Sequence, residues 1–363
     1  MRHGRISGLL YTFQSLFGGR TSQTAEVPGG EALMRRRSAV CLMMAASVLV
    51  FACSSPGDGP SLKPASPSGA ARGGSAPPRA AVETVFRTRP QFGVTVPGIS
   101  QASLGEVART TACPPAMAQF FVSVTHGLDP TVLGAVPVTP IVTVEPWNPD
   151  KGVNQSDFTL DKTIEGRWDD HYRAIAMVVK KYGRPVLIRF AHEMNGYWYP
   201  WASVGSNTPA LFVAAWQHVV GIFRDAGVTN ALWVWSPNVL RGTSGTPLAE
   251  YYPGDKWVDL MGLTGYGVQE SSAAQTYDPS MAQLAALSTK PVLLTEVGAQ
   301  RDQYKTSWIA SFGSWLQSHP QVVGFVWTAM NIKDGVKGDW RYDDSEADLA
   351  AFRASLLAGR VAC

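Results

Sequence analysis

From about residue 90 onward, short apolar runs alternate with longer stretches in which apolar positions recur at a helical period. Continuous apolar runs are typical of strands buried on both faces of a parallel sheet, whereas a period of about 3.6 residues indicates helices that cover such a sheet. The apolar runs predict strands at 91–96, 119–124, 140–145, 185–191, 231–235, 258–264, 291–296 and 322–327. The pattern therefore predicts strands and helices in alternation.

Helix start and stop residues support this division. They predict a helix over 209–226 between Thr208-Pro209 and Gly227, a helix opened by Asp278-Pro279, and a last helix from Ser345 to Gly359. Eight strands separated by helices within about 270 residues predict an α/β fold, namely a single-domain (β/α)8 TIM barrel. A doubly wound open sheet is the alternative, but no glycine-rich phosphate-binding turn follows the first strand.

The first 52 residues read as a leader. Residues 1–33 have no readable pattern and form a possible upstream extension, because an export signal begins at Met34. Residues 34–52 combine three arginines with an apolar stretch too short to span a bilayer, which is typical of a signal peptide. The "VFAC" that ends it resembles a lipoprotein cleavage box and predicts a lipid on Cys53. An ordinary signal peptide is the alternative.

A linker and one folded domain are predicted after the signal. Residues 53–89 are rich in Pro, Gly and Ser and are expected to form a flexible tether to a domain at 90–363. The protein is expected to be exported, either anchored in the cell membrane and facing outward or secreted. Cys41 would leave with the signal, so Cys113 and Cys363 are a predicted disulfide pair in oxidising surroundings.

Composition and charge narrow the function classes. With 45% hydrophobic and 16% charged residues, the chain suits a globular enzyme-sized domain. The formal net charge of the chain is +3. The first 52 residues hold six arginines and two glutamates and so have a net charge of +4, which leaves −1 for residues 53–363. No basic surface for nucleic acid is therefore expected.

Reactive side chains follow several strands at ends that a barrel brings to one rim, where active sites of this fold lie. They are Glu145 and Trp147, His192 and Glu193, Tyr266, Glu296 and Trp327. Two carboxyl groups across a cleft suit glycoside hydrolysis, and aromatic faces stack on the apolar face of a sugar. A zinc-protease reading of His192-Glu193 fails, because the HExxH motif would need histidine at Gly196.

The motifs around these residues resemble those of glycoside hydrolase family 26. In chain order they are RFAHEMNGYWYPW (189–201), WVWSPN (233–238), YYPGD (251–255), VDLMGLTGY (258–266), LLTEVG (293–298) and DW (339–340). The resemblance covers about residues 90–358. It implies a retaining (β/α)8 glycosidase that uses no cofactor and no metal.

Residue by residue, the resemblance implies Glu193 as the acid/base and Glu296 as the nucleophile. It implies substrate contacts by His192, Trp198, Tyr266, Trp327 and Trp147, with Tyr266 also hydrogen-bonded to the nucleophile. Glu145 either binds substrate or holds a neighbouring side chain. Arg189 is expected to orient the acid, and His126 is a weaker candidate for a sugar contact.

The implied activity is that of a retaining endo-β-glycanase, with endo-β-1,4-mannanase expected because mannan is the commonest substrate in the family. The stretch 264–267 reads Thr-Gly-Tyr-Gly where close family members have Asp-Gly-Tyr-Asn, and a Trp that commonly follows is absent. Mixed-linkage β-glucan, β-1,3-xylan and a cell-envelope glycan therefore stay open as substrates. A non-catalytic surface glycan-binding protein is the alternative of another class. We expect a monomer whose partners are a polysaccharide and, through its lipid, the membrane.

Overall fold

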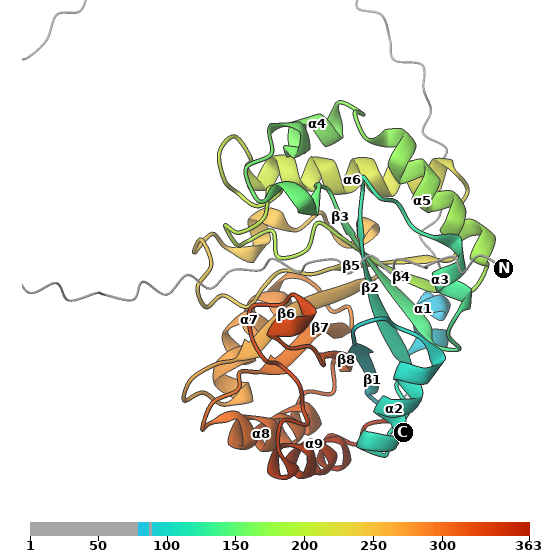
Figure 1. The fold of residues 1–363 in the computed structure, drawn as a ribbon. Coiled ribbons are helices and arrows are strands. Elements are labelled where there is room, and N and C mark those ends of the chain that lie inside the picture. The colour runs from blue at the N-terminus through green and yellow to red at the C-terminus, as the bar shows by residue number, and fades with distance from the viewer. Residues whose placement is uncertain (1–78, 87–88) are drawn as a thin grey trace, which may run out of the picture. The chain divides into compact units, whose positions relative to one another are not determined.

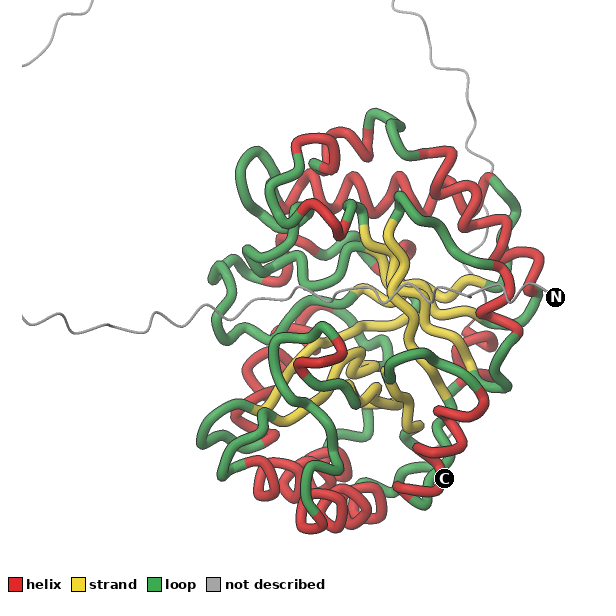
Figure 2. The backbone as a smooth tube through the Cα atoms, viewed as in Figure 1, coloured by secondary structure: helices red, strands yellow, loops and turns green. Residues whose placement is uncertain are grey.

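A computed structural model describes residues 79–86 and 89–363, so the predicted extension, signal peptide, Cys53 and most of the tether lie outside the described residues. In this part of the chain eight parallel strands close into a barrel in chain order. Figures 1 and 2 show the strands enclosed by helices. Because β1 is hydrogen-bonded to both β2 and β8, the sheet has no open edge. The predicted (β/α)8 fold is confirmed.

The strands are β1 (Gln91–Thr95), β2 (Met117–Ser123), β3 (Thr139–Glu145), β4 (Val186–Phe190), β5 (Ala231–Trp235), β6 (Leu260–Gly267), β7 (Val292–Ala299) and β8 (Val322–Thr328). The α-helices are α1 (Arg79–Val85), α2 (Gln101–Thr111), α3 (Pro130–Gly134), α4 (Leu160–Ile164), α5 (Asp169–Tyr182), α6 (Pro209–Asp225), α7 (Ala273–Leu287), α8 (Lys305–Ser318) and α9 (Glu346–Ala358). Short 3-10 helices are η1 (Pro149–Lys151), η2 (Ser156–Phe158), η3 (Leu248–Tyr251), η4 (Asp255–Trp257) and η5 (Ile332–Asp334). Each predicted strand is present, with small shifts at its ends.

Helix α7 begins earlier than the sequence predicted. The expected start at Asp278-Pro279 is wrong, because Pro279 lies inside the helix. Ser272 starts α7 instead: its hydroxyl accepts the amide of Gln275 at 3.2 Å, and the side-chain oxygen of Gln275 accepts the amide of Ser272 at 2.8 Å. This reciprocal cap satisfies two amide groups at the helix start. Tyr277 before the proline and Met281 after it are both buried, so packing holds the helix together there.

Helix α1 closes the end of the barrel at which the strands begin. Val85 and Phe86 are buried together with apolar side chains of the lumen, among them Met117, Ile141 and Leu187. Residues 79–86 therefore belong to the folded domain, although the sequence predicted them as part of the 53–89 tether. The segment RAAVETVF offers few large apolar side chains, so its pattern was too weak to separate it from a linker.

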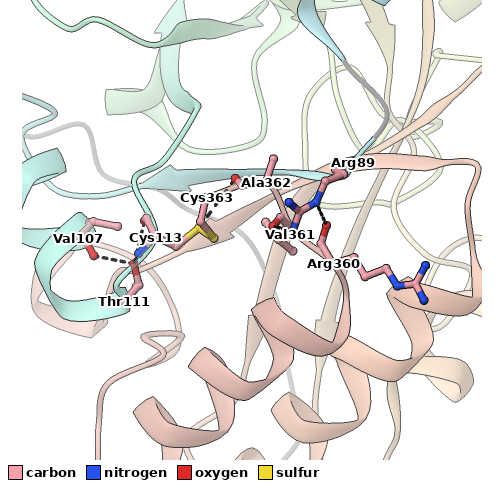
Figure 3. The surroundings of a disulfide bond; sticks show 8 residues. All are labelled: Arg89, Val107, Thr111, Cys113, Arg360, Val361, Ala362 and Cys363. Carbon is pink, nitrogen blue, oxygen red and sulfur yellow. Dashed lines mark hydrogen bonds between the residues drawn. A yellow bond between two sulfur atoms is a disulfide. The ribbon is translucent and has the colours of Figure 1, made fainter.

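A disulfide joins Cys113 and Cys363, the pair that the sequence predicted (Figure 3). Cys113 lies between α2 and β2, and Cys363 follows the segment after α9. Beside the bridge, the amide of Ala362 donates to the carbonyl of Pro90 at 2.8 Å. The bond therefore fastens the segment after α9 beside the start of β1, on the face of the barrel opposite the strand ends that carry reactive groups.

We expect loss of this disulfide to destabilise the fold. The two cysteines are 250 residues apart in sequence, and closing so long a loop stabilises by up to about 5 kcal/mol in the chain-entropy model. The variant Cys113→Ser/Cys363→Ser should lower the urea midpoint, and reduction of the wild type should lower it equally. Two free thiols in unfolded, unreduced protein that lacks residues 1–53 would contradict the bond.

Candidate active site

A sharp turn after β4 places Glu193 at the ends of the strands. Ala191 and Glu193 have φ values of 44° and 55°, a region that residues other than glycine rarely adopt. The amide of Glu193 donates to the carbonyl of Ser236 at 2.8 Å and holds the turn against β5. Such backbone conformations persist where the surroundings enforce them, often at active sites. Here the turn leaves the Glu193 side chain buried.

Trp198 holds the carboxyl group of Glu193. Its indole Nε1 donates to Oε2 of Glu193 at 2.6 Å. The ring lies so close to Gly196 that a Cβ atom there would stand 2.6 Å from it, so a larger residue would displace the indole. The residue predicted as a substrate contact is thus a direct hydrogen-bond donor to the candidate acid.

Glu296, on β7, accepts two short hydrogen bonds. Arg189 Nη1 donates to Oε1 at 2.6 Å, and the hydroxyl of Tyr266 donates to Oε2 at 2.6 Å. The Nη2 atom of Arg189 donates to Thr264 at 2.5 Å. The carboxylate is therefore fixed in one orientation by donors on both oxygens. The sequence predicted Arg189 as the partner of the acid, but the structure gives its direct ion pair to Glu296 instead, because both side chains point into the lumen.

One arginine faces three buried carboxyl groups. Burial raises the pKa of Glu193 to about 8, and the charge of Glu296 adds to this effect. Burial also raises the pKa of Glu145 to about 7, although a hydrogen bond from Trp147 opposes it. Arg189 is paired to Glu296, and among residues 79–86 and 89–363 no second cation offsets a charge on the other two. Glu193 therefore holds a proton at neutral pH, as a general acid must.

His192 is buried between Glu145 and Tyr199. Its Nε2 lies 3.0 Å from the Tyr199 hydroxyl and 4.0 Å from Oε1 of Glu145. Burial, and then the charge of Arg189, hold the pKa of His192 well below its usual range. The imidazole is therefore neutral and available as a hydrogen-bonding group.

Trp147 lies in an aromatic cluster beside this site. Its ring meets those of Tyr199 and Trp201 edge to face, with centroids 5.6 Å apart in both pairs. Its Nε1 donates to Oε2 of Glu145 at 3.1 Å. Because only 2% of Trp147 is exposed, its ring has no free face for the predicted sugar contact. Glu145 accepts a hydrogen bond from its neighbour Trp147, which fits the second of its two predicted roles.

Trp327 does not face the mouth of the barrel. It is fully buried against Phe312 and Phe352 of the helix layer, with ring centroids 6.2 and 4.8 Å away. Neighbouring residues of a strand point to opposite faces, so Thr328 points inward, 3.1 Å from the Tyr266 hydroxyl. The predicted sugar platform at Trp327 is corrected: the strand alternation turns this side chain outward.

Trp340 is the tryptophan that borders Tyr266 instead, with ring centroids 4.5 Å apart. The indole of Trp327 donates to the carbonyl of Trp340 at 2.8 Å, and the amide of Trp340 donates to Met330 at 2.9 Å. Sequence reasoning used the DW motif at 339–340 as a family mark but assigned Trp340 no role. The motif was the available signal, yet only the fold shows which tryptophan reaches the site.

The rim beside β2 is more open. His126 and Phe121 line a cavity of about 630 Å³, and the Phe121 ring meets that of His192 with centroids 5.9 Å apart. His126 Nε2 lies 3.9 Å from the Asp150 carboxylate. Across residues 79–86 and 89–363, no group of three or more His, Cys, Asp or Glu side chains is placed to hold a metal ion.

Two buried carboxyl groups, Glu193 just after β4 and Glu296 within β7, place the protein in the class of paired-carboxylate (β/α)8 barrels. The chain matches the family model described as Glycosyl hydrolase family 26 over residues 153–315, a range that contains both Glu193 and Glu296. Over these residues, which are just under half of the chain, the protein is similar to glycosyl hydrolase family 26.

Similar proteins extend this finding. The chain is 33% identical over 232 residues to Endoglucanase H of Acetivibrio thermocellus. This alignment covers 60% of the present chain and 24% of the relative. The chain is 31% identical over 150 residues to a mannan endo-1,4-beta-mannosidase of Bacillus subtilis, covering 40% of this chain and 39% of the relative. It thus spans well under two thirds of these relatives. The catalytic domain of a Bacillus sp. JAMB-750 endo-beta-1,4-mannanase has the same fold, with a TM-score of 0.59 at 17% identity over 78% of this chain and 90% of that one.

We expect Glu193→Gln to stabilise the protein at high pH only. The pKa of Glu193 is raised from 4.5 to about 8 in the folded state, so its contribution to stability is complete below pH 4.5 and is lost as the pH rises through 8. Urea unfolding should show the variant more stable than the wild type by at least about 1 kcal/mol at pH 9 and little changed at pH 4. The exposed Glu250→Gln is the matched control. Equal differences at both pH values would refute the assignment.

Proposed function

We propose that the protein is a retaining endo-β-glycanase, with endo-β-1,4-mannanase as the first activity. The observation that carries this proposal is the division between the two carboxyl groups. Glu193 is protonated and held by Trp198, whereas Glu296 is held by Arg189 and Tyr266. A retaining glycosidase needs one carboxyl group that gives a proton and another that attacks the sugar.

The reaction then runs in two displacements. Glu193 protonates the glycosidic oxygen while its bond to the anomeric carbon breaks, and Glu296 bonds to that carbon from the opposite side. The ionised Glu193 next takes a proton from water, whose oxygen replaces Glu296 at the same carbon. Two inversions retain the configuration. Arg189 and Tyr266 keep the Glu296 oxygens in place before and after the covalent intermediate.

The identity of the substrate has weaker support than the type of reaction. Mannan comes first because the family resemblance implies it and the Bacillus subtilis relative is named for it. A β-glucan is the second candidate, since the Acetivibrio thermocellus relative, named an endoglucanase, matches more of the chain. A glycan-binding protein without activity is disfavoured, because such a protein has no need of a protonated Glu193 beside Glu296.

A polysaccharide panel tests these options. Purified protein should release reducing sugar from β-1,4-mannan, with mixed-linkage β-glucan, β-1,3-xylan and cell-envelope extract as the other arms. Release from β-glucan alone would assign the second candidate. Binding to a glycan without release from any arm would overturn the hydrolase in favour of the glycan-binding protein.

Azide rescue distinguishes the two carboxyl groups. Glu193→Ala should lose about 10²–10⁴-fold activity on unactivated substrates but still form the glycosyl-enzyme from an aryl glycoside whose leaving group needs no proton. Azide, which needs no general base, should restore its turnover and give a β-glycosyl azide. Glu296→Ala should lose nearly all turnover on every substrate. A β-azide from Glu296→Ala, or an α-azide from Glu193→Ala, would mean that the roles are exchanged, and inverted product from the wild type would exclude the mechanism.

We further propose that the protein is exported as a lipoprotein and acts as a monomer outside the cell membrane. The support is the arginine-rich signal, the "VFAC" box and the tether-like segment that follows it. Within residues 79–86 and 89–363, no helix has the length and apolar character needed to cross a bilayer. An anchored enzyme would meet glycans at the surface of its own cell, which makes the cell-envelope arm of the panel worth including.

Lipidation at Cys53 predicts a fractionation result. The several acyl chains of a lipoprotein hold a protein firmly to a membrane, whereas one chain does so only marginally. Wild-type protein should sediment with membranes, and Cys53→Ala should appear in the soluble fraction or keep its signal. Cys41→Ala is the matched control and should fractionate like the wild type. Identical fractionation and migration of Cys53→Ala would refute the anchor.

A further inference from the structure

Four side chains on β1 to β4 bury polar atoms that have no hydrogen-bond partner among the described residues. They are the hydroxyls of Thr95 and Thr143, both amide atoms of Gln119, and Nε of Arg189. All four residues are buried. Buried polar groups nearly always find a partner in the protein or in bound water, because an unmet group costs its full desolvation penalty. Several such atoms on neighbouring strands therefore require an explanation.

The strand register brings these atoms together in the lumen. Because the strands of a barrel are staggered, side chains from alternate strands share one layer. Gln119 pairs with Ile141, Ile141 pairs with Leu187, and Arg189 is the next inward residue after Leu187. Gln119 and Arg189 thus belong to one layer. Thr143 pairs directly with Arg189 and comes from the strand between them.

The buried polar groups on the opposite side of the lumen have hydrogen-bond partners. The hydroxyls of Ser236 and Thr295 lie 2.6 Å apart, and Thr264 accepts from Arg189 at 2.5 Å. The unmet atoms of strand residues therefore lie on the side of β1 to β4. Thr95 and Gln119 also line the cavity of about 630 Å³, although the amide atoms of Gln119 are themselves closed to solvent.

We propose that Gln119 is a positioning residue for Glu296 and acts through Arg189 by means of bound water. A water beside Gln119 accepts the Nε–H of Arg189 and donates to the Gln119 oxygen or to Thr143. These groups supply the two to four partners that a buried water needs. Held at Nε as well as at Nη1 and Nη2, the guanidinium plane cannot turn, so Nη1 stays on Glu296.

Water suits this place better than other occupants. A cation is disfavoured because the charge of Arg189 lies in the same layer. A sugar is disfavoured because the amide atoms of Gln119 are closed to solvent. The Gln119 amide can both donate and accept, and so can water, which lets one cluster satisfy donors and acceptors together. The positioning role rests on the proposed function, whereas the water site does not.

The variant Gln119→Met tests the water site without any assay of activity. Methionine keeps the length of the side chain and removes both amide atoms. If Gln119 were dry and unpaired, the variant would raise the urea midpoint, because an unmet polar group would be gone. With bound water the midpoint should fall, and a high-resolution crystal structure of the wild type should show water within hydrogen-bond distance of Arg189 Nε and Gln119.

Kinetics test the positioning role. Gln119→Met should lower kcat, normalised to the concentration of active sites, about tenfold, because a slightly misplaced nucleophile reacts more slowly. It should leave KM within about twofold, because Gln119 touches no substrate. Gln119→Asn, which keeps the amide and leaves room for one more water, should recover most of kcat. Val326→Ala, on β8 beside the same layer, is the control for loosened packing.

Each outcome decides one part. A raised midpoint in Gln119→Met, or a lumen without water in the crystal structure, overturns the water site. Unchanged kcat, or the same kinetic loss in Val326→Ala, overturns the positioning role. If the wild type cleaves no polysaccharide, the proposed function and the positioning role fall together, while unfolding and crystallography still decide whether water binds at Gln119.

Discussion

The buried ion pair between Arg189 and Glu296 sets the charge state of the whole site. Both side chains are almost completely buried, and a charge taken out of water is tolerated only when it is paired and hydrogen-bonded. Glu193 and Glu145 share this environment without a cation of their own, and their raised pKa values are the consequence. The carboxyl group that Arg189 contacts is held in an ion pair, whereas burial raises the pKa of the other two. The roles of acid and nucleophile follow from that single contact.

Aromatic side chains donate hydrogen bonds to the carboxyl groups of the site. Each of the three buried carboxyl groups of the site accepts one hydrogen bond from an aromatic side chain, in the pairs Trp147 to Glu145, Trp198 to Glu193 and Tyr266 to Glu296. An indole or phenol donor excludes water with its apolar body and orients the carboxyl group with its polar edge. The aromatic residues that follow β4 in the sequence therefore position the catalytic groups more directly than they offer surface to a sugar.

The strands, and the carboxyl groups just after β4 and on β7, could be predicted because local apolar runs and short motifs encode them. The direction of a side chain at the end of a strand depends on register, so Trp327 was predicted on the wrong face of β8. Contacts between strands could not be predicted either. Arg189 contacts Glu296 on β7, and nothing near residue 189 in the sequence indicates this contact. Long-range register is the information that a single sequence does not state.

Because Trp327 is buried, a different tryptophan, Trp340, borders the site at the mouth of the barrel. The buried indole of Trp327 holds the carbonyl of Trp340, and the loop after Trp340 is fastened by Asp344, which pairs with the buried Lys305 and accepts from Arg341 at 2.6 Å. Trp340 is thus carried by a loop that is fixed through core contacts and buried charges. A sugar ring that reached it would meet an aromatic face already in place, so little binding free energy would be lost to ordering the loop. Rigidity at the mouth and the fixed charge at the centre then serve the same end: both keep the groups that meet the substrate in position before it arrives.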